Sequence, residues 1–154
     1  MQIESAKGFL WVREIAEASP RLQALIFGPG DYSATMQMPV ANIGELDEND
    51  HLYPGHRWHA VMHAVVAAAR ANGLRAIDGP YAGYRDTSGL ERASRIARVM
   101  GFDGKQCIHP SQLSVVNRDL QSVGRRGRAR ESRGRRRMRR PRRPGAAQSE
   151  KTGR

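Results

Sequence analysis

The segment that most constrains the fold is a short apolar run followed at once by a turn and a carboxylate, in residues 24–31. The run Ala24 to Phe27 is rich in Leu, Ile and Phe, which predicts a strand buried on both faces. The strand is expected to stop at Gly28-Pro29-Gly30, because Pro removes a backbone donor and Gly permits unusual dihedral angles. Asp31 then stands at the carboxyl end of the strand, where parallel α/β folds hold their chemistry. The alternative is a turn residue that caps the next segment.

A second carboxylate is placed in the same way. Glu4 follows the short strand Met1–Ile3, and a helical segment separates it from the run at Ala24. Neighbouring strands of a parallel sheet lie roughly 4.8 Å apart, so both carboxylates would stand at matched heights. Such a pair can share one hard cation such as Mg²⁺, which prefers oxygen ligands and keeps several waters. The sequence therefore predicts a metal site at Glu4 and Asp31.

The rest of the chain continues this alternation up to about residue 117. A capping-box spacing of Ser88 and Glu91 marks one helix start, and Gly73 and Gly101 suit helix ends. The remaining elements are expected as helices at 9–18, 58–71, 88–101 and 111–116, a strand at 74–78, a strand with its exit at 104–110, and a long loop at 32–55. This order predicts an α/β fold with a parallel sheet and right-handed crossovers. The long loop is either a functional lid or a solvated excursion.

Charge divides the chain into two parts. The whole sequence of 154 residues has a net charge of +11, but residues 121–154 carry fourteen basic and two acidic residues, a net charge of +12. Residues 1–120 are nearly neutral, at −1. The Arg-rich segment has no hydrophobic periodicity, so we expect residues 1–117 to form a domain and 118–154 a disordered basic tail.

Cysteine usage and hydropathy suit a cytoplasmic protein with no membrane partner. Cys107 is the only cysteine, which excludes a disulfide within the chain. No signal peptide and no apolar run of membrane-spanning length is present.

Other candidate groups have weaker patterns. His56, His59 and His63 share one helical face, but no Cys or carboxylate falls in step with them, so helix surface is preferred to a metal site. His109 is either an acid/base or a ring that hydrogen-bonds the backbone, and we prefer the second interpretation. Asp78 repeats the placement of a carboxylate at a strand end.

Several motifs in their order resemble the citrate lyase β-subunit-like and malyl-CoA lyase family, within the HpcH/HpaI aldolase superfamily. The resemblance covers about residues 1–117 and is closest to malyl-CoA lyases from Arg70 to Gln112. The segments that carry it are Ile3-Glu4-Ser5, Gly28-Pro29-Gly30-Asp31, Ala67 to Gly73, Ala76-Ile77-Asp78-Gly79-Pro80-Tyr81, Asp86 with Gly89, Gly101 to Lys105, and Ile108-His109-Pro110-Ser111-Gln112.

The resemblance implies a fold and a chemistry. The fold would be a partial (β/α)8 TIM barrel, comprising the last four βα units. The reaction would be Mg²⁺-dependent cleavage or formation of a 3-hydroxyacyl-CoA, with a 2-oxo acid and acetyl-CoA on the other side. Glu4 and Asp31 would bind Mg²⁺, and the amides of Gly30 and Asp31 would hold the carboxylate of the 2-oxo acid. Residues 108–110 (Ile108, His109 and Pro110) would lie near the thioester arm of coenzyme A, and the full-length enzyme would be a homo-oligomer.

Two family features have no counterpart in this sequence: an Arg from an earlier strand and an acid/base Asp from a C-terminal segment. No catalytic acid or base is therefore visible, and we expect a weakly active or inactive piece of such a lyase, with Met1 at an internal position. The tail is either native or the out-of-frame translation of a GC-rich coding sequence. Half a barrel would also leave Ile26, Ile77 and Ile108 partly exposed.

A rival function belongs to a different class. Runs such as Arg135-Arg136-Arg137 would neutralise phosphates, so the chain could instead be a non-specific nucleic-acid or polyanion binder on a degenerate scaffold. No aromatic residue is interleaved to stack on bases, which weakens this interpretation.

Overall fold

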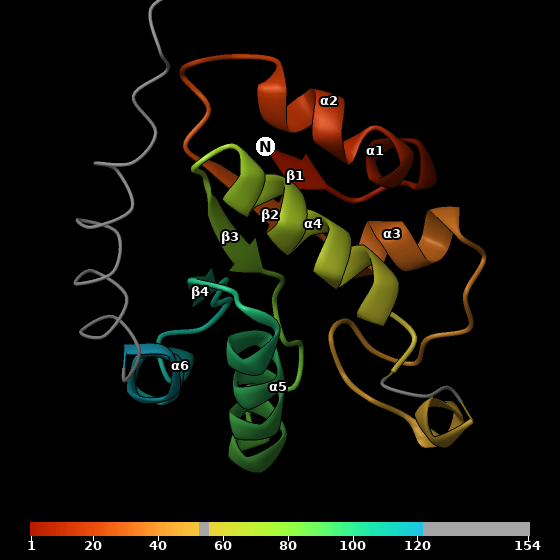
Figure 1. Ribbon diagram of the computed structural model, residues 1–154. Coiled ribbons are helices and arrows are strands. Elements are labelled where there is room, and N and C mark those ends of the chain that lie inside the picture. The colour runs from red at the N-terminus through yellow and green to blue at the C-terminus, as the bar shows by residue number, and fades with distance from the viewer. Residues whose placement is uncertain (53–55, 122–154) are drawn as a thin grey trace, which may run out of the picture. The chain divides into compact units, whose positions relative to one another are not determined.

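The computed structural model describes residues 1–52 and 56–121, and these contain a four-stranded parallel sheet. The strand order is β1-β2-β3-β4, the order of the sequence, which confirms the predicted parallel α/β arrangement (Figure 1). The strands are β1 (Gln2–Ile3), β2 (Ala24–Phe27), β3 (Arg75–Asp78) and β4 (Gly104–Lys105). Of the basic tail predicted at 118–154, residues 118–121 are instead part of the last helix, which ends at Gln121, whereas residues 122–154 and the nucleic-acid function assigned to them lie outside the described residues.

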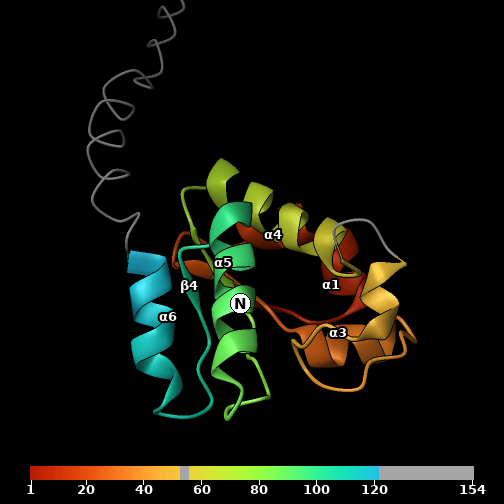
Figure 2. The same cartoon turned by 90° about the horizontal axis from the view of Figure 1, so that it is seen from below.

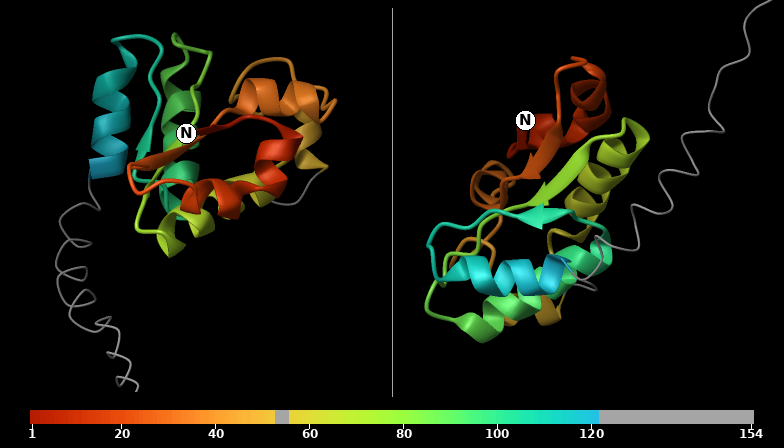
Figure 3. Two further views of the ribbon diagram at one scale, coloured as in Figure 1. Left: turned by 90° about the horizontal axis from the view of Figure 1, so that it is seen from above. Right: turned by 90° about the vertical axis from the view of Figure 1, so that its left-hand side faces the viewer.

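Helices cover one face of the sheet. The helices are α1 (Ala6–Leu10), α2 (Val12–Glu17), α3 (Pro29–Thr35), α4 (His59–Ala71), α5 (Thr87–Met100) and α6 (Gln112–Gln121), with a 3₁₀ turn η1 (Glu48–His51). Helix α4 lies across β2 and β3 and also contacts α2. Helices α5 and α6 lie side by side (Figure 2), and α6 also contacts β4 (Figure 3).

The register of the strands decides which side chains meet those helices. Ile3 pairs with Phe27, and Leu25 pairs with Ala76. All four are at most 1% exposed and belong to one core with the buried face of α4. The members of that face are Val61, Met62, Val65, Ala68 and Ala69. The apolar residues of α4 recur on one face of the helix, and the core therefore lies between that face and the sheet.

The opposite face of the sheet is less covered. Gln2, Ile26 and Ile77 alternate with the buried residues and pair with one another across the strands. Ile26 and Ile77 are only half-buried, and Ile108 is 58% exposed. This confirms the exposure predicted for these three residues, whereas full burial of the second strand on both faces is wrong.

Several predicted boundaries need correction. The helix predicted at 9–18 begins at Ala6, where Ser5 caps it, and is interrupted at Trp11. Strand β2 ends at Phe27, which confirms the predicted stop at Gly28-Pro29-Gly30, but Pro29 then occupies the first turn of a helix that was not predicted, α3, where a missing N–H costs nothing. The predicted loop 32–55 therefore contains α3 and η1.

The second half also differs from prediction in detail. Asp86 rather than Ser88 caps α5, accepting a hydrogen bond from the Gly89 N–H at 2.9 Å. Of the strand and exit predicted at 104–110, only Gly104–Lys105 form strand β4, and α6 continues to Gln121 rather than ending at Val116.

Among the described residues, no helix is both long and apolar enough to cross a membrane. This agrees with the hydropathy of the same part of the sequence.

Candidate functional site

The two predicted metal-binding carboxylates stand at the carboxyl ends of adjacent strands. Because Ile3 pairs with Phe27, Glu4 stands opposite Gly28. A Cβ atom added to Gly28 would lie 2.7 Å from the Glu4 Cβ and 3.1 Å from its Oε2. Glycine at position 28 thus lets the half-buried Glu4 side chain lie over the end of β2.

Asp31 lies three residues further, in the first turn of α3, and is exposed. It does not cap the helix, because the N-cap residue is Gly28 and makes no side-chain cap. Neither Asp31 nor Glu4 has a hydrogen-bond or ion-pair partner for its carboxylate within residues 1–52 and 56–121. Both carboxylates are therefore available to a ligand from outside the described chain.

The backbone beside Asp31 offers donors as well. The first four N–H groups of a helix have no intrahelical acceptor, and they carry the positive end of the helix dipole. In α3 these positions include Gly30 and Asp31, whereas the Tyr32 N–H returns to the Gly28 carbonyl at 3.1 Å. Free amides next to two carboxylates can hold a cation and an anion side by side.

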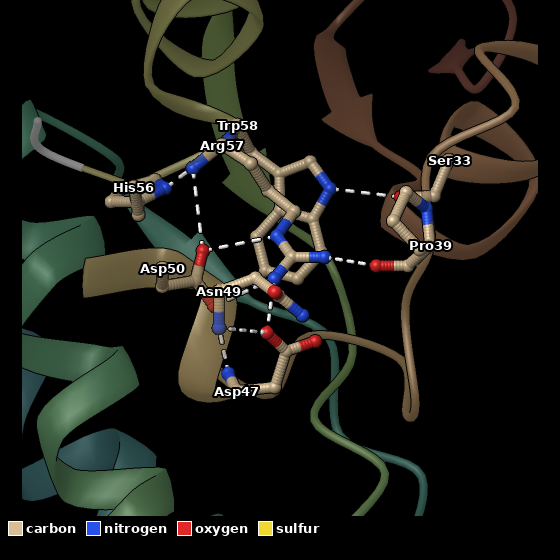
Figure 4. A network of polar contacts seen from close by, with 8 residues as sticks. All are labelled: Ser33, Pro39, Asp47, Asn49, Asp50, His56, Arg57 and Trp58. Atoms are coloured by element: carbon tan, nitrogen blue, oxygen red, sulfur yellow. Dashed lines mark hydrogen bonds and ion pairs between the residues drawn. The ribbon is translucent and has the colours of Figure 1, made fainter. Parts of the chain in front are cut away.

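The segment between α3 and α4 is held beside these strand ends by one arginine (Figure 4). The Arg57 guanidinium donates to the Asp47 carboxylate, to Asp50 Oδ1 at 3.0 Å and to the Pro39 carbonyl. At the end of the same segment, Trp58 donates its indole N–H to Ser33 Oγ at 2.9 Å. We call the segment 36–58, within its described residues, the clamped loop.

Charge pairing in the clamped loop shifts three pKa values. The hydrogen bond from Asn49 N–H, helped by Arg57, lowers the pKa of Asp47. Burial raises the pKa of Asp50, but hydrogen bonds from Arg57 and from backbone N–H groups outweigh it, so the net pKa is lowered. Hydrogen bonding to Asp50 raises the pKa of Arg57. These described residues of the loop are tied by ion pairs, which argues against a wholly solvated excursion.

Asp78 does not join the two carboxylates. It points to the helix-covered side, where Lys105 Nζ donates to its Oδ2 at 2.6 Å and the Gly79 N–H donates to its Oδ1 at 2.8 Å. Both side chains are more than 90% buried. Asp78 therefore acts in an internal ion pair, a role that its strand-end position did not reveal.

The three histidines of the α4 start do not form a metal site. Their rings pack edge to face, with centroids 5.9 Å apart for His56 and His59 and 4.5 Å apart for His59 and His63. His59 and His63 are exposed. Within the described part of the chain no group of three His, Cys, Asp or Glu side chains could hold a metal.

The residues after β4 form an exposed exit. His109 Nδ1 lies 2.8 Å from Ser111 Oγ and 3.2 Å from the Ser111 backbone N, which confirms the backbone contact predicted for this ring. The ring also stacks on Tyr84 with centroids 4.9 Å apart. The buried Gln112 side chain fixes the turn by bonding the Ile108 N–H and the Tyr81 carbonyl, both at 2.9 Å. Sequence reasoning missed this role of Gln112.

Comparisons with known proteins agree on one family. The sequence profile described as HpcH/HpaI aldolase/citrate lyase matches residues 1–110. An L-malyl-CoA/beta-methylmalyl-CoA lyase of Cereibacter sphaeroides is 40% identical over an alignment of 121 residues, and the match covers 75% of this chain and 38% of that relative. The chain thus spans well under half the length of that relative.

Solved structures show the same likeness. RipC from Yersinia pestis has a TM-score of 0.66 at 33% identity, covering 77% of this chain and 49% of that one. A citrate lyase beta subunit from M. tuberculosis, complexed with oxaloacetate and magnesium, has a TM-score of 0.63 at 31% identity. This match covers 78% of the chain and 51% of the M. tuberculosis protein.

Proposed function

The chain belongs to the HpcH/HpaI aldolase/citrate lyase family, and we propose that it supplies the metal-binding and oxo-acid-binding part of a carbon–carbon lyase. The reaction would cleave or form a 3-hydroxyacyl-CoA of the malyl-CoA type, giving a 2-oxo acid and acetyl-CoA. The name of the Cereibacter sphaeroides relative supports the CoA thioester, and the M. tuberculosis complex supports the oxo acid and magnesium. The whole enzyme's activity is part of the proposal, since the chain covers 38% of that relative.

The fold is assigned on the same basis. We take the four strands as the last four βα units of a (β/α)8 barrel. A parallel sheet with helices on one face and half-buried isoleucines on the other suits a segment of a barrel wall. The carboxyl ends of the strands, where Glu4 and Asp31 lie, would then face the mouth of the barrel.

One observation carries the metal assignment: Glu4 lies over Gly28, at the end of the strand that leads into Asp31. Two carboxylates without partners among the described residues are the hard oxygen donors that suit Mg²⁺, which completes its shell with water and substrate. When bound there, Mg²⁺ would act as a Lewis acid toward the 2-oxo acid.

The remaining residues bind and orient substrate. The Gly30 and Asp31 N–H groups would donate to the carboxylate of the 2-oxo acid, where the dipole of α3 favours negative charge. The exposed exit at Ile108, His109 and Pro110 would contact the arm of coenzyme A. We assign no general base to residues 1–52 and 56–121.

Calorimetric titration of the full chain with Mg²⁺, alone and with glyoxylate, tests the assignment. We expect Glu4→Gln and Asp31→Asn each to weaken Mg²⁺ binding by at least about ten-fold, since loss of an outer-sphere partner alone costs that much at metal sites. Glu17→Gln, which changes an exposed carboxylate on α2, is the matched control and should bind like the parent chain. Unchanged binding in both site variants would overturn the metal assignment.

A further inference from the structure

A cavity with apolar walls and a few polar side chains lies on the helix-covered side of the sheet, away from Glu4. It is bounded by α4, α5, the clamped loop and the carboxyl ends of β2 to β4. Its lining includes Phe27, His56, Asp78, Arg92 and Lys105, and its volume is about 40 Å³. Phe27 and the Glu4 side chain lie on opposite faces of the sheet, because a Cβ at Gly28, next to Phe27, would meet Glu4. The cavity is thus separate from the proposed metal site.

His56 presents a hydrogen-bond donor that is not used within the described chain. The Trp58 N–H lies 3.3 Å from His56 Nδ1 and donates to it. In the neutral ring an accepting Nδ1 leaves the proton on Nε2. The residue is only 8% exposed, and its Nε2 has no partner among the described residues. Burial, the largest influence, lowers the pKa of His56, which keeps the ring neutral near pH 7.

Lys105 adds further donors from the floor of the cavity. Its side chain is 3% exposed, and its single hydrogen bond within the described residues goes to Asp78. An ammonium group has three N–H donors, so two are left. The Asp78 carboxylate already accepts from Lys105 at Oδ2 and from the Gly79 N–H at Oδ1.

Arg92 completes the set at the exposed side of the cavity. It projects from α5 and makes no hydrogen bond or ion pair within residues 1–52 and 56–121, and it lines the same cavity as Lys105 and His56. Among the residues that line the cavity, Lys105 and Asp78 cancel in charge, so Arg92 leaves one net positive charge and an excess of donors. The Asp86 carboxylate, outside the lining, acts electrostatically on Arg92. A buried donor without an acceptor is costly, so this arrangement calls for an acceptor that carries negative charge.

We propose that this cavity binds a small monovalent anion, with His56, Lys105 and Arg92 as its donors. A water needs about 10–15 Å³ of such volume, so there is room for roughly three waters or for one ion of the size of formate, acetate or chloride. Because His56 directly precedes Arg57, anion binding would also fasten the clamped loop to α5.

Formate, acetate and chloride are the probes that test the site, each titrated into the full chain at constant ionic strength. Binding is followed by NMR, through the ring resonances of His56 and the side-chain signal of Arg92, and by thermal melts. We expect saturable shifts with one binding constant per anion. Formate against chloride separates a carboxylate site from a site for any monovalent anion, and either result supports the proposal.

Two pairs of variants make the readout specific. Arg92→Gln should weaken binding about ten-fold, the equivalent of one lost charge-assisted hydrogen bond. Arg95→Gln, an equal loss of charge on the same helix outside the cavity, should leave it unchanged. His56→Phe should weaken binding similarly, and His63→Phe, an exposed position on α4, should not.

Basic residues elsewhere in the chain are common to all variants, so they cannot produce a difference within a pair. Equal binding by Arg92→Gln and Arg95→Gln would overturn the proposal, as would linear, non-saturating shifts. If the His56→Phe chain does not fold, the comparison of Arg92→Gln with Arg95→Gln tests the proposal by itself.

Discussion

The two faces of the sheet differ in how their side chains are satisfied. On the helix-covered face, Ile3, Leu25 and Phe27 are at most 1% exposed, and the charges there, Asp78 and Lys105, are paired. On the opposite face Ile26 and Ile77 are half-buried, and Glu4 has no partner among the described residues. Apart from the cavity beside α5, the first face is a closed apolar core. The second face holds groups that are available to ligands or to further protein.

This contrast shows that a strand-end carboxylate is not by itself a functional one. Asp78 and Glu4 both end strands of the same sheet, but Asp78 is neutralised by a lysine that the neighbouring strand supplies. What separates them is the face to which each side chain points.

The largest effect is expected from breaking the internal ion pair. Lys105→Met should lower the free energy of unfolding by about 3–5 kcal/mol, because it leaves Asp78 charged and buried without a counterion. Adding Asp78→Asn should restore much of the loss. Arg13→Met breaks an exposed pair with Glu14 and should cost less than about 1 kcal/mol. Urea unfolding of the three variants measures this, and a Lys105→Met cost as small as that of Arg13→Met would contradict the burial of the pair.

A smaller difference should separate two adjacent residues of β2. Leu25→Ala should cost about 2–5 kcal/mol, because it opens a cavity in a closed core. Ile26→Ala should cost less than half of that, since its side chain keeps much of its contact with water in the parent chain. Equal costs in urea unfolding would mean that the open face is covered in solution, for example by a second copy.

The smallest effect concerns the clamped loop and pH. Asp47 and Asp50 have lowered pKa values in the folded chain, so their contribution is present above the ordinary value of 3.8 and is lost as the pH falls through the folded values. Arg57→Gln removes the partner of both carboxylates, so the variant should be less stable than the parent chain at pH 6. This difference in stability should decrease as the pH falls from 6 to 3, because the parent chain loses the contribution of the ion pairs. Thermal melts across that range measure the difference, and a constant difference would show that the ion pairs do not contribute.

Local patterns predicted much of the fold. The apolar run at 24–27, the Ala-rich helix α4 and the strand before Gly79 are encoded by short-range hydrophobicity, and they appear as expected. Pro29 and its flanking glycines correctly marked the end of β2, but helix α3 was missed, because Pro is also favoured in the first turn of a helix. Trp11 interrupts a helix for which no Gly or Pro gives a signal.

The site was less accessible to sequence reasoning than the fold. The parallel strand order predicted that Glu4 lies beside the end of β2, and the structure has this parallel pairing of β1 with β2. The partners of Asp78 and Arg57 did not follow, since Lys105 is 27 residues away and the contacts of Arg57 span 7 to 18 residues. Such pairings depend on how elements pack, and no local spacing marks them.

The central claim is that Glu4 and Asp31 form a metal site on the open side of the sheet. Mn²⁺ accepts the same oxygen ligands as Mg²⁺ and broadens NMR signals of nearby nuclei, so substoichiometric Mn²⁺ in the full chain locates the site directly. The account predicts that the amide signals of Gly28, Gly30 and Asp31 broaden first, that excess Mg²⁺ restores them, and that Val65 on the covered side is unaffected. Broadening centred on Asp47 and Asp50, or none that Mg²⁺ reverses, would contradict it.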